Sequence, residues 1–369
     1  MWIWEQKNWP DFQWNERELI AILREINFNQ GLLLGLSATE NTEQATLDNL
    51  LASILYSCEI EGEKLNVASV RSSLANHLGI SEEKPYPISE QSDGIARIAL
   101  EVVEKYQEPL TLERILQWHE WMFPVGHRLI NPINGGQLRH GGIEVVSGRI
   151  DKPVVHFSAP PAERLQQEVA QFITWFNRSS YDPNLDPILR AAIVHLWFVT
   201  LHPLEDGNGR ITRFLTDLAL AQAESRSIRL YAMSVSICES RKQYYEMLEQ
   251  TQRGGLDITD WMRWFLQTLN STLIVKLKQI DGTVKKTRFW RRVDQSQLNE
   301  EQVKVLNRML DGDFSQGINS SQYQKVAKVS RATATRHLIY LTELGYLDKT
   351  EAGGRSTRYV IHHVNGVTK

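Results

Sequence analysis

The sequence predicts a mainly α-helical protein with two short β-hairpins. Over most of the 369 residues, apolar side chains recur at the three- and four-residue spacing of amphipathic helices. Two stretches, residues 142–157 and 344–361, instead combine short β-forming runs with Gly or Pro at their boundaries. A composition of 42% hydrophobic and 23% charged residues is typical of globular proteins, and the length allows two or three domains.

The expected helices follow one another along the chain. One apolar stripe defines a helix near residues 45–62 and consists of Leu47, Leu50, Leu51, Ile54, Leu55 and Cys58. Further helices are predicted at residues 16–27, 94–106, 112–123, 162–178, 187–201, 209–224, 239–252 and 258–279. Asp186 is a suitable N-cap for the 187–201 helix, and Pro187 suits its first position because that position needs no N–H donor.

The first hairpin, residues 142–157, lies inside the helical region. Its β-forming runs, IEVVSG and PVVHF, are separated by RIDK, and Gly and Pro-Pro bound the stretch. A β-hairpin among helices is either a plain surface feature or part of a functional site.

The C-terminal part of the chain differs from the rest in charge. From Lys285 to the end there are 15 Lys and Arg against 8 Asp and Glu, a net charge of +7, so residues 1–284 carry −10. We expect a linker at residues 281–296 and a separate domain at 297–369. Such an asymmetry suggests different partners for the two parts, with nucleic acid the usual partner of the basic one.

Residues 297–369 are predicted to form three helices followed by the second hairpin. The helices are expected around Val303–Leu310, over Ser320–Ala327 and from an N-cap at Ser330 to Leu344, where Leu338 and Leu341 form the apolar face. This order resembles the winged helix-turn-helix class, with the third helix in the recognition position. The basic residues around that helix and the wing are Lys325, Lys328, Arg331, Arg336, Arg355 and Arg358. DNA is therefore one candidate partner; winged helices also bind proteins or form dimers.

The sequence also predicts a cytoplasmic protein without a membrane partner. The two cysteines, Cys58 and Cys238, lie far apart and match no zinc spacing, so we expect reduced thiols. The N-terminus lacks the basic and apolar regions of a signal peptide, and the longest apolar-rich run, residues 191–201, is about half a membrane span. Four early tryptophans, at positions 2, 4, 9 and 14, are expected to pack on the helical core or in a dimer contact, the alternative being a sugar or peptide platform.

One segment, His202 to Arg213, carries the residues for chemistry. Gly207 and Gly209 permit a tight turn at a helix N-terminus, where unpaired N–H groups and the helix dipole favour a phosphate. Arg210 and Arg213 lie on one face of that helix and suit a polyphosphate. Two side chains precede the turn: Asp206 is a hard ligand suited to Mg²⁺, and His202 has the pKa of a general base near pH 7. Together they indicate phosphoryl or nucleotidyl transfer.

This segment resembles the signature of the Fic family of protein adenylyltransferases, His-Pro-Phe-x-(Asp/Glu)-Gly-Asn-Gly-Arg-x-x-Arg. Every defined position matches except Leu204, which replaces a packing Phe. The resemblance covers residues 45–275 and implies a helical cap at 1–110 and a Fic catalytic core at 111–280. It also implies transfer of AMP from ATP to a Tyr, Thr or Ser hydroxyl of a target protein.

The resemblance also implies a role for each residue of the segment. His202 would deprotonate the acceptor hydroxyl, and Asp206 would hold Mg²⁺ on the α- and β-phosphates. Gly207, Asn208 and Gly209 would surround the phosphates, while Arg210 and Arg213 would bind the β/γ end. The first hairpin is similar to the family's flap, which docks the target backbone by strand addition and borders the nucleotide at Val155, His156, Phe157 and Ser158. Tyr244 and Tyr245 are similar to a pair that borders the adenine, and Gln252 to a polar adenine contact; core packing is the alternative for the tyrosines.

A second, shorter match lies upstream. Ser57, Glu61 and Gly62 resemble the family's inhibitory motif, (Ser/Thr)-x-x-x-Glu-(Gly/Asn), at the end of the 45–62 helix. The resemblance implies that Glu61 pairs with Arg213 in the place of the γ-phosphate, as a switch. In some relatives the same Glu supports removal of AMP. An ordinary exposed helix end is the alternative.

These observations favour an autoinhibited protein adenylyltransferase, and the resemblance allows removal of AMP as a second activity. The alternative from another class is a DNA-binding transcriptional regulator whose Fic domain senses nucleotide. A third hypothesis changes the donor, because relatives with altered motifs transfer phosphate, UMP or phosphocholine. By analogy, a homodimer would be one way to control the release of Glu61.

Overall fold

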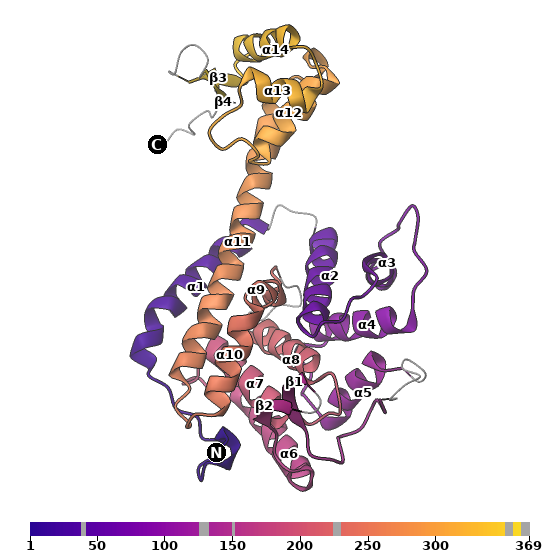
Figure 1. Ribbon diagram of the computed structural model, residues 1–369, viewed down its shortest axis with the longest axis vertical. Coiled ribbons are helices and arrows are strands. Elements are labelled where there is room, and N and C mark those ends of the chain that lie inside the picture. Colours follow the sequence, from indigo (N-terminus) through magenta and orange to yellow (C-terminus); the bar gives the residue numbers. More distant parts are fainter. Residues whose placement is uncertain (38–41, 125–132, 150–151, 224–229, 351–356, 363–369) are drawn as a thin grey trace. The chain divides into compact units, whose positions relative to one another are not determined.

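The computed structural model describes residues 1–37, 42–124, 133–149, 152–223, 230–350 and 357–362 (Figure 1). The chain divides into two units, Met1–Lys276 and Leu277–Lys369, and the division falls inside helix α11, Thr259–Arg292. We call them the first and second units and describe each by itself.

The first unit is built almost entirely from helices, as predicted. Its elements are the 3-10 turn Ile3–Glu5, α1 (Glu16–Ser37), α2 (Thr42–Ile60), α3 (Val67–His77), α4 (Glu90–Glu104), α5 (Leu112–Met122), β1 (Glu144–Arg149), β2 (Lys152–Ser158), α6 (Ala162–Ser179), α7 (Pro187–Leu201), α8 (Asn208–Ala223), α9 (Met233–Glu239), α10 (Arg241–Gln252) and the start of α11. The sequence did not predict α3 or α9, and α11 continues well beyond residue 279.

Helices α7 and α8 form the centre of the first unit. Every residue of α7 from Ile188 to Leu201 is buried, including the polar or charged Arg190, His195 and Thr200, which agrees with its mostly apolar sequence. The Asp186 carboxylate accepts the Ile188 N–H at 2.8 Å, with Pro187 in the first turn, and this confirms the predicted start of the helix. The helix ends at His202, whose φ of 46° turns the chain toward α8. The segment predicted to carry chemistry therefore joins two buried helices.

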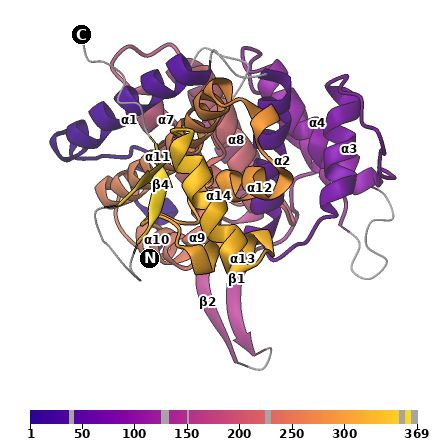
Figure 2. The ribbon, with the colours of Figure 1, turned by 90° about the horizontal axis from the view of Figure 1, so that it is seen from above.

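Strands β1 and β2 form the predicted hairpin, which projects from the helices of the first unit (Figure 2). The strands are antiparallel, with Val146 opposite Val155 and an irregular register between Val145 and Val146. Residues 150 and 151, in the predicted turn, lie outside the described residues.

The N-terminal tryptophans pack on the first unit, as one of the two expectations had it. The Trp2 ring lies edge-on to Phe157 with ring centroids 5.3 Å apart, and the Trp4 indole N–H donates to the Ser158 carbonyl at 2.8 Å. Trp9 donates to Glu168 at 2.9 Å. The contacts of Trp2 and Trp4 hold β2 against the N-terminal segment, and that of Trp9 holds α6.

Helix α1 corrects one expectation from the sequence. Over Glu16–Leu36, its 21 residues are long and apolar enough to cross a membrane by length and composition, so the 191–201 run is not the strongest candidate. One face of α1 contacts α11 within the first unit: Asn29 donates to the Asn270 side chain at 2.8 Å, and Asn270 donates to Glu25 at 3.0 Å.

The second unit has three helices followed by a two-stranded antiparallel sheet. Its elements are the end of α11, the 3-10 turn Gln295–Gln297, α12 (Glu300–Leu310), α13 (Ser320–Ala327), α14 (Arg331–Glu343), β3 (Leu347–Lys349) and β4 (Tyr359–Ile361). Its core includes Phe289, Leu306, Tyr323, Leu338 and Leu347. The Ser330 hydroxyl accepts the Thr333 N–H at 3.1 Å, which confirms the predicted N-cap of α14. The segment predicted as a linker is helical as far as Arg292.

Candidate active site

The loop between α7 and α8 is fixed by its own side chains and by glycine. The Asn208 side-chain oxygen accepts the Leu204 N–H at 2.9 Å, and its amide donates to the Leu204 carbonyl at 2.8 Å. Leu204 itself is fully buried, in the packing role expected of this position. Gly207 has a φ of 79°, and a Cβ there would lie 2.9 Å from the Phe123 ring. These contacts fix the conformation of the loop up to the N-terminus of α8.

His202 is arranged as a neutral base. Its Nδ1 lies 3.2 Å from the Val199 carbonyl, so Nδ1 carries the proton and donates it there. Burial lowers the pKa of His202 below its ordinary value, and the charge of Arg139 lowers it further. The imidazole is therefore uncharged at neutral pH, and His202 lines the cavity described below.

Arg139 is a residue of the site that we did not predict. Its guanidinium donates to the carbonyls of His202 at 2.7 Å and Pro160 at 2.6 Å, and its own N–H donates to the Pro203 carbonyl at 3.0 Å. It ties the base-bearing loop to the segment that leaves β2. In sequence a buried Arg looks like a solvated one, so no pattern pointed to it.

Arg210 and Arg213 lie near the start of α8 and are almost fully buried, each with 3% of its side chain exposed. The Arg210 guanidinium lies over the Phe123 ring, 5.0 Å from its centroid. Among the described residues, Nε of Arg210 and Nη1 of Arg213 are buried without a hydrogen-bond partner. Buried guanidinium N–H groups without partners are suited to an anion that the chain itself does not supply.

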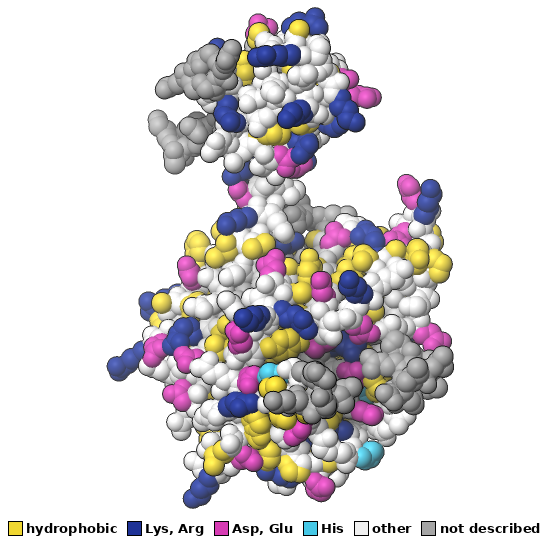
Figure 3. Space-filling view, in the orientation of Figure 1, with side chains coloured by type: hydrophobic (Ala, Val, Ile, Leu, Met, Phe, Trp, Pro, Cys, Tyr) yellow, Lys and Arg dark blue, Asp and Glu magenta, His cyan; other side chains and the backbone are white. Residues whose placement is uncertain are grey.

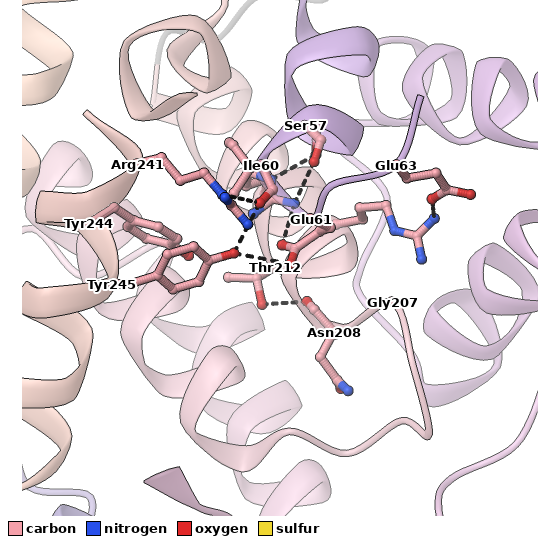
Figure 4. Close-up of polar contacts among 12 residues, drawn as sticks. Ser57, Ile60, Glu61, Glu63, Gly207, Asn208, Thr212, Arg241, Tyr244 and Tyr245 are labelled. Carbon is pink, nitrogen blue, oxygen red and sulfur yellow. Dashed lines mark hydrogen bonds and ion pairs between the residues drawn. The ribbon is translucent and has the colours of Figure 1, made fainter. Parts of the chain in front are cut away.

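The Glu61 carboxylate lies over the N-terminus of α8 (Figure 4). Arg213 Nη2 donates to it at 2.8 Å, and the same arginine donates to the Ser57 hydroxyl at 2.7 Å and the Ser57 carbonyl at 2.8 Å. Burial would raise the pKa of Glu61, but Arg213 and its hydrogen bond hold it below the ordinary value, so the pair is ionic. A Cβ on Gly209 would lie 2.0 Å from this carboxylate. The Glu61 carboxylate therefore fills the space at the helix N-terminus that is suited to a phosphate.

A cavity of about 790 Å³ opens beside His202 and brings most of the predicted nucleotide residues together. Those that line it are Glu61, His156, Phe157, His202, Gly209, Tyr244, Tyr245 and Gln252. Val155, Ser158, Asp206, Gly207, Asn208, Arg210 and Arg213 are not among its lining residues. Its size is within the range of small-molecule sites.

The aromatic pair on α10 has two different environments. Tyr244 is buried, and its hydroxyl bonds to His195 Nε2 at 2.9 Å. The Tyr245 hydroxyl donates to Glu61 and to the Ile60 carbonyl, both at 3.2 Å, so it contacts the end of α2 (Figure 4). Gln252 donates to the Thr200 hydroxyl at 3.2 Å.

The hairpin is attached to α10 by polar contacts. His156 Nδ1 lies 2.7 Å from Glu249, and its Nε2 lies 2.6 Å from the Ser147 hydroxyl. Arg253 donates to the Val155 carbonyl at 2.7 Å. These contacts place β2 along one wall of the cavity.

Asp206 is the single predicted metal ligand. One of its carboxylate oxygens accepts the Gly207 N–H at 2.5 Å and lies 3.7 Å from Arg210, and 39% of the side chain is exposed. Within the described ranges there is no group of three or more His, Cys, Asp or Glu side chains that would hold a metal. A single partly exposed carboxylate fits Mg²⁺ only in company with substrate phosphates, which is how this ion usually binds.

The fold and the site define a helical domain in which a glycine-containing turn, a partly buried histidine and two buried arginines lie at the junction of two central helices, beside a β-hairpin. The Fic/DOC family profile matches residues 109–220, which include the His202 to Arg213 segment. A further profile, a domain of unknown function (DUF4172), matches residues 2–80.

Curated relatives agree with this family. The chain is 28% identical over 223 residues to a protein adenylyltransferase Fic of Drosophila willistoni, and 27% identical to that of Drosophila melanogaster. The match covers 60% of this chain and 40% of either relative, so the chain spans about two fifths of the length of these proteins.

Solved structures share the fold. A Fic family protein from Desulfovibrio desulfuricans aligns with a TM-score of 0.53 and 19% identity over 95% of this chain and 97% of that one. Fic-1 from C. elegans aligns with a TM-score of 0.52 and 18% identity over 73% of this chain and 74% of the other. At these identities the likeness concerns the fold.

Proposed function

We propose that the chain is a protein adenylyltransferase, held inactive by Glu61. The observation that carries the proposal is the Glu61 carboxylate, which lies against Gly209 at the start of α8 and is bonded to Arg213. An anion of the chain itself occupies the place suited to a phosphate, next to a neutral histidine and a nucleotide-sized cavity.

In the proposed reaction, Nε2 of His202 takes the proton of a Tyr, Thr or Ser hydroxyl on a target protein. The hydroxyl oxygen attacks the α-phosphorus of ATP, the bond to the bridging oxygen of the β-phosphate breaks, and pyrophosphate leaves. A general base at this step typically contributes about 10²- to 10⁴-fold to the rate. His202 is supported in this role because its Nδ1 proton is directed to Val199, which leaves Nε2 as the acceptor.

The phosphates would bind at the start of α8, with the base in the cavity. Gly207, Asn208 and Gly209 would surround them, and Arg210 and Arg213 would bind the β- and γ-phosphates. Asp206 would hold a Mg²⁺ ion, which supplies positive charge to the phosphate oxygens. Tyr244, Tyr245 and Gln252 would border the base, and Val155 to Ser158 would form the opposite edge.

The target protein would add to the hairpin. On the described part of β1 and β2, Val145, Val146 and Val154 expose at least a third of their surface, which suits pairing with an extended segment of another chain. The same Glu61 would allow the reverse reaction if it orients a water toward AMP on the target.

The test is transfer of label from α-labelled ATP to proteins of a lysate with Mg²⁺. Wild type should label weakly, Glu61→Gly strongly, and the double variant Glu61→Gly/His202→Ala about 10²- to 10⁴-fold less than Glu61→Gly. Glu59→Gln is the matched control, because Glu59 is an exposed carboxylate in the same turn and should behave as wild type. Label from γ-labelled ATP or from UTP in place of α-labelled ATP would instead show another donor chemistry, and no label in any variant would contradict the transferase.

A second candidate function concerns the second unit. Helices α12 to α14 and strands β3 and β4 follow the order of a winged helix, and α14 exposes Arg331 and Arg336. Lys325 and Lys328 are exposed as well, Arg358 is partly exposed, and Arg355 lies outside the described residues. Binding of DNA through this unit would make the Fic domain a nucleotide sensor for a regulator.

A further inference from the structure

We infer that Glu63 is a second inhibitory carboxylate, which blocks Arg210 as Glu61 blocks Arg213. The inference rests on the proposed function of the site and extends it. Glu63 is outside the (Ser/Thr)-x-x-x-Glu-(Gly/Asn) pattern, and the sequence alone gave no reason to select it.

The end of α2 forms a turn that presents two carboxylates. The Gly62 N–H donates to the Glu59 carbonyl at 2.9 Å and the Glu63 N–H donates to the Cys58 carbonyl at 3.0 Å, which is the Schellman pattern of a helix C-terminus. Gly62 has the positive φ, 77°, that this pattern requires. Glu61 and Glu63 lie on either side of this glycine, and each reaches a different arginine of α8.

Both oxygens of the Glu63 carboxylate are engaged. Arg210 Nη1 donates to one of them, and the Gln91 amide of α4 donates to the other. The Glu63 side chain is 22% exposed and that of Arg210 3%, so the pair is mostly shielded from water. Solvent and salt screen a shielded ion pair less than a surface one. Figure 4 shows Glu63 on the side of the site opposite Tyr245.

The two pairs divide the site between them. Glu61 pairs with Arg213, and Glu63 pairs with Arg210, which also lies 3.7 Å from the partly exposed Asp206. Both arginines are therefore paired with carboxylates before a nucleotide arrives. Loss of Glu61 frees Arg213 but leaves Arg210 paired. A nucleotide that has a β-phosphate must then still displace Glu63, whereas AMP, which lacks that phosphate, need not.

The opposite role would be that Glu63 aligns Arg210 for the phosphate, and this makes the contrary prediction. If Glu63 only aligns the arginine, its loss weakens the binding of ATP. If Glu63 competes with the phosphate, the loss of Glu63 strengthens the binding of ATP. The sign of one affinity change therefore separates the two roles.

The experiment measures equilibrium binding of ATP, ADP and AMP to the full chain with Mg²⁺, which needs no transfer activity. In the Glu61→Gly background, Glu63→Gln should bind ATP and ADP about 10-fold more tightly and AMP unchanged, since glutamine keeps the shape and one acceptor oxygen but loses the charge. Glu59→Gln in the same background is the matched control and should change none of the three. An ATP affinity that is unchanged or weaker in Glu63→Gln overturns the inference.

A second variant covers the case in which Glu63→Gln does not fold. Gln91→Leu removes the other contact of the Glu63 carboxylate and leaves both arginines intact, so ATP should again bind more tightly, by a smaller factor of about 2 to 3. No change in ATP affinity in Gln91→Leu would count against the inference.

Failure of the proposed function can be distinguished from failure of the inference. If only the function fails, no variant transfers AMP, yet Glu63→Gln still binds ATP more tightly. Transfer by Glu61→Gly, with ATP binding indifferent to Glu63, would uphold the function and overturn the inference.

Discussion

At the scale of single residues, the state of His202 leads to a prediction about pH. Burial and Arg139 lower its pKa, whereas the charge of Glu61 raises it, so removal of Glu61 should lower it further. A base is active when unprotonated, so transfer by the Glu61→Gly variant should be constant between about pH 8 and the ordinary histidine value near 6.5, and should fall only below that. The measurement is kcat/KM for ATP against pH at saturating target. A midpoint above 6.5 would contradict the assigned environment of His202.

The residues of the site that the sequence predicted are those whose chemistry is tied to local spacing. His202, Gly207, Gly209, Arg210 and Arg213 all lie on one turn and the helix after it, so their proximity follows from their order. Arg139 and Glu63 were not predicted because their partners come from other elements. In sequence each is a charged residue of the kind that most often faces solvent, and only the packing of α2, α4 and α8 shows that they are paired inside the protein.

At the scale of elements, the turn that ends α2 is the part that holds both carboxylates. Gly62 has a φ of 77° and no atom within 4 Å of an added Cβ, so alanine there would suffer backbone strain without a clash. The left-handed conformation costs a non-glycine residue about 1–2 kcal/mol. Gly62→Ala should therefore weaken the hold on Glu61 and Glu63 together, raise AMP transfer by less than Glu61→Gly does, and lower the free energy of unfolding by about 1 kcal/mol.

Gly31→Ala is the control for that variant. Gly31 lies in α1 with nothing within 4 Å of an added Cβ and without a positive φ, so alanine should stabilise the helix by a few tenths to 1 kcal/mol. Thermal or denaturant unfolding measures stability, and α-labelled ATP measures transfer. If Gly62→Ala lowers transfer below wild type, the turn supports activity and does not restrain it.

Capping residues mark some of the helices that the sequence predicted, but a cap alone does not distinguish them from the helices it missed. The missed helix α3 also begins with a cap, Asn66, which accepts the Ser69 N–H at 3.1 Å. Asp186 and Ser330 each mark the start of a helix, and both are caps in the structure. Helix α9 has only seven residues, too few for a periodic pattern, and it has no side-chain cap. Ser240 separates it from α10, whereas the sequence predicted a single helix from residue 239 to 252. Helix α3 buries Ser69, Ser72 and Ser73, which in sequence are typical of a loop.

At the scale of the whole molecule, charge separates the chain into an acidic part and a basic part. The +7 of residues 285–369 against −10 before them is visible from composition alone, and Lys and Arg side chains are spread over the face of the second unit seen in Figure 3. The division of the chain falls within α11, so the boundary is a continuous helix. A sequence pattern shows that two units differ in charge, but it does not show whether the basic one binds DNA or a protein.

The DNA-binding hypothesis predicts a steep dependence of duplex binding on salt. Each phosphate that a Lys or Arg contacts contributes about 0.9 to the slope of log K against log salt, so Arg331→Ala and Arg336→Ala should each reduce the slope by about 1. Both arginines are exposed at the N-terminal half of α14, where a recognition helix meets the major groove. Arg308→Ala is the matched control, because Arg308 is exposed but paired with Asp313, and its loss should leave the slope unchanged. The measurement is the affinity of the full chain for a duplex between about 50 and 200 mM salt. No binding at the lowest salt, or an equal loss of slope in all three variants, would contradict DNA binding through α14, because only contact of Arg331 and Arg336 with DNA phosphates gives a slope that depends on these two arginines and not on Arg308.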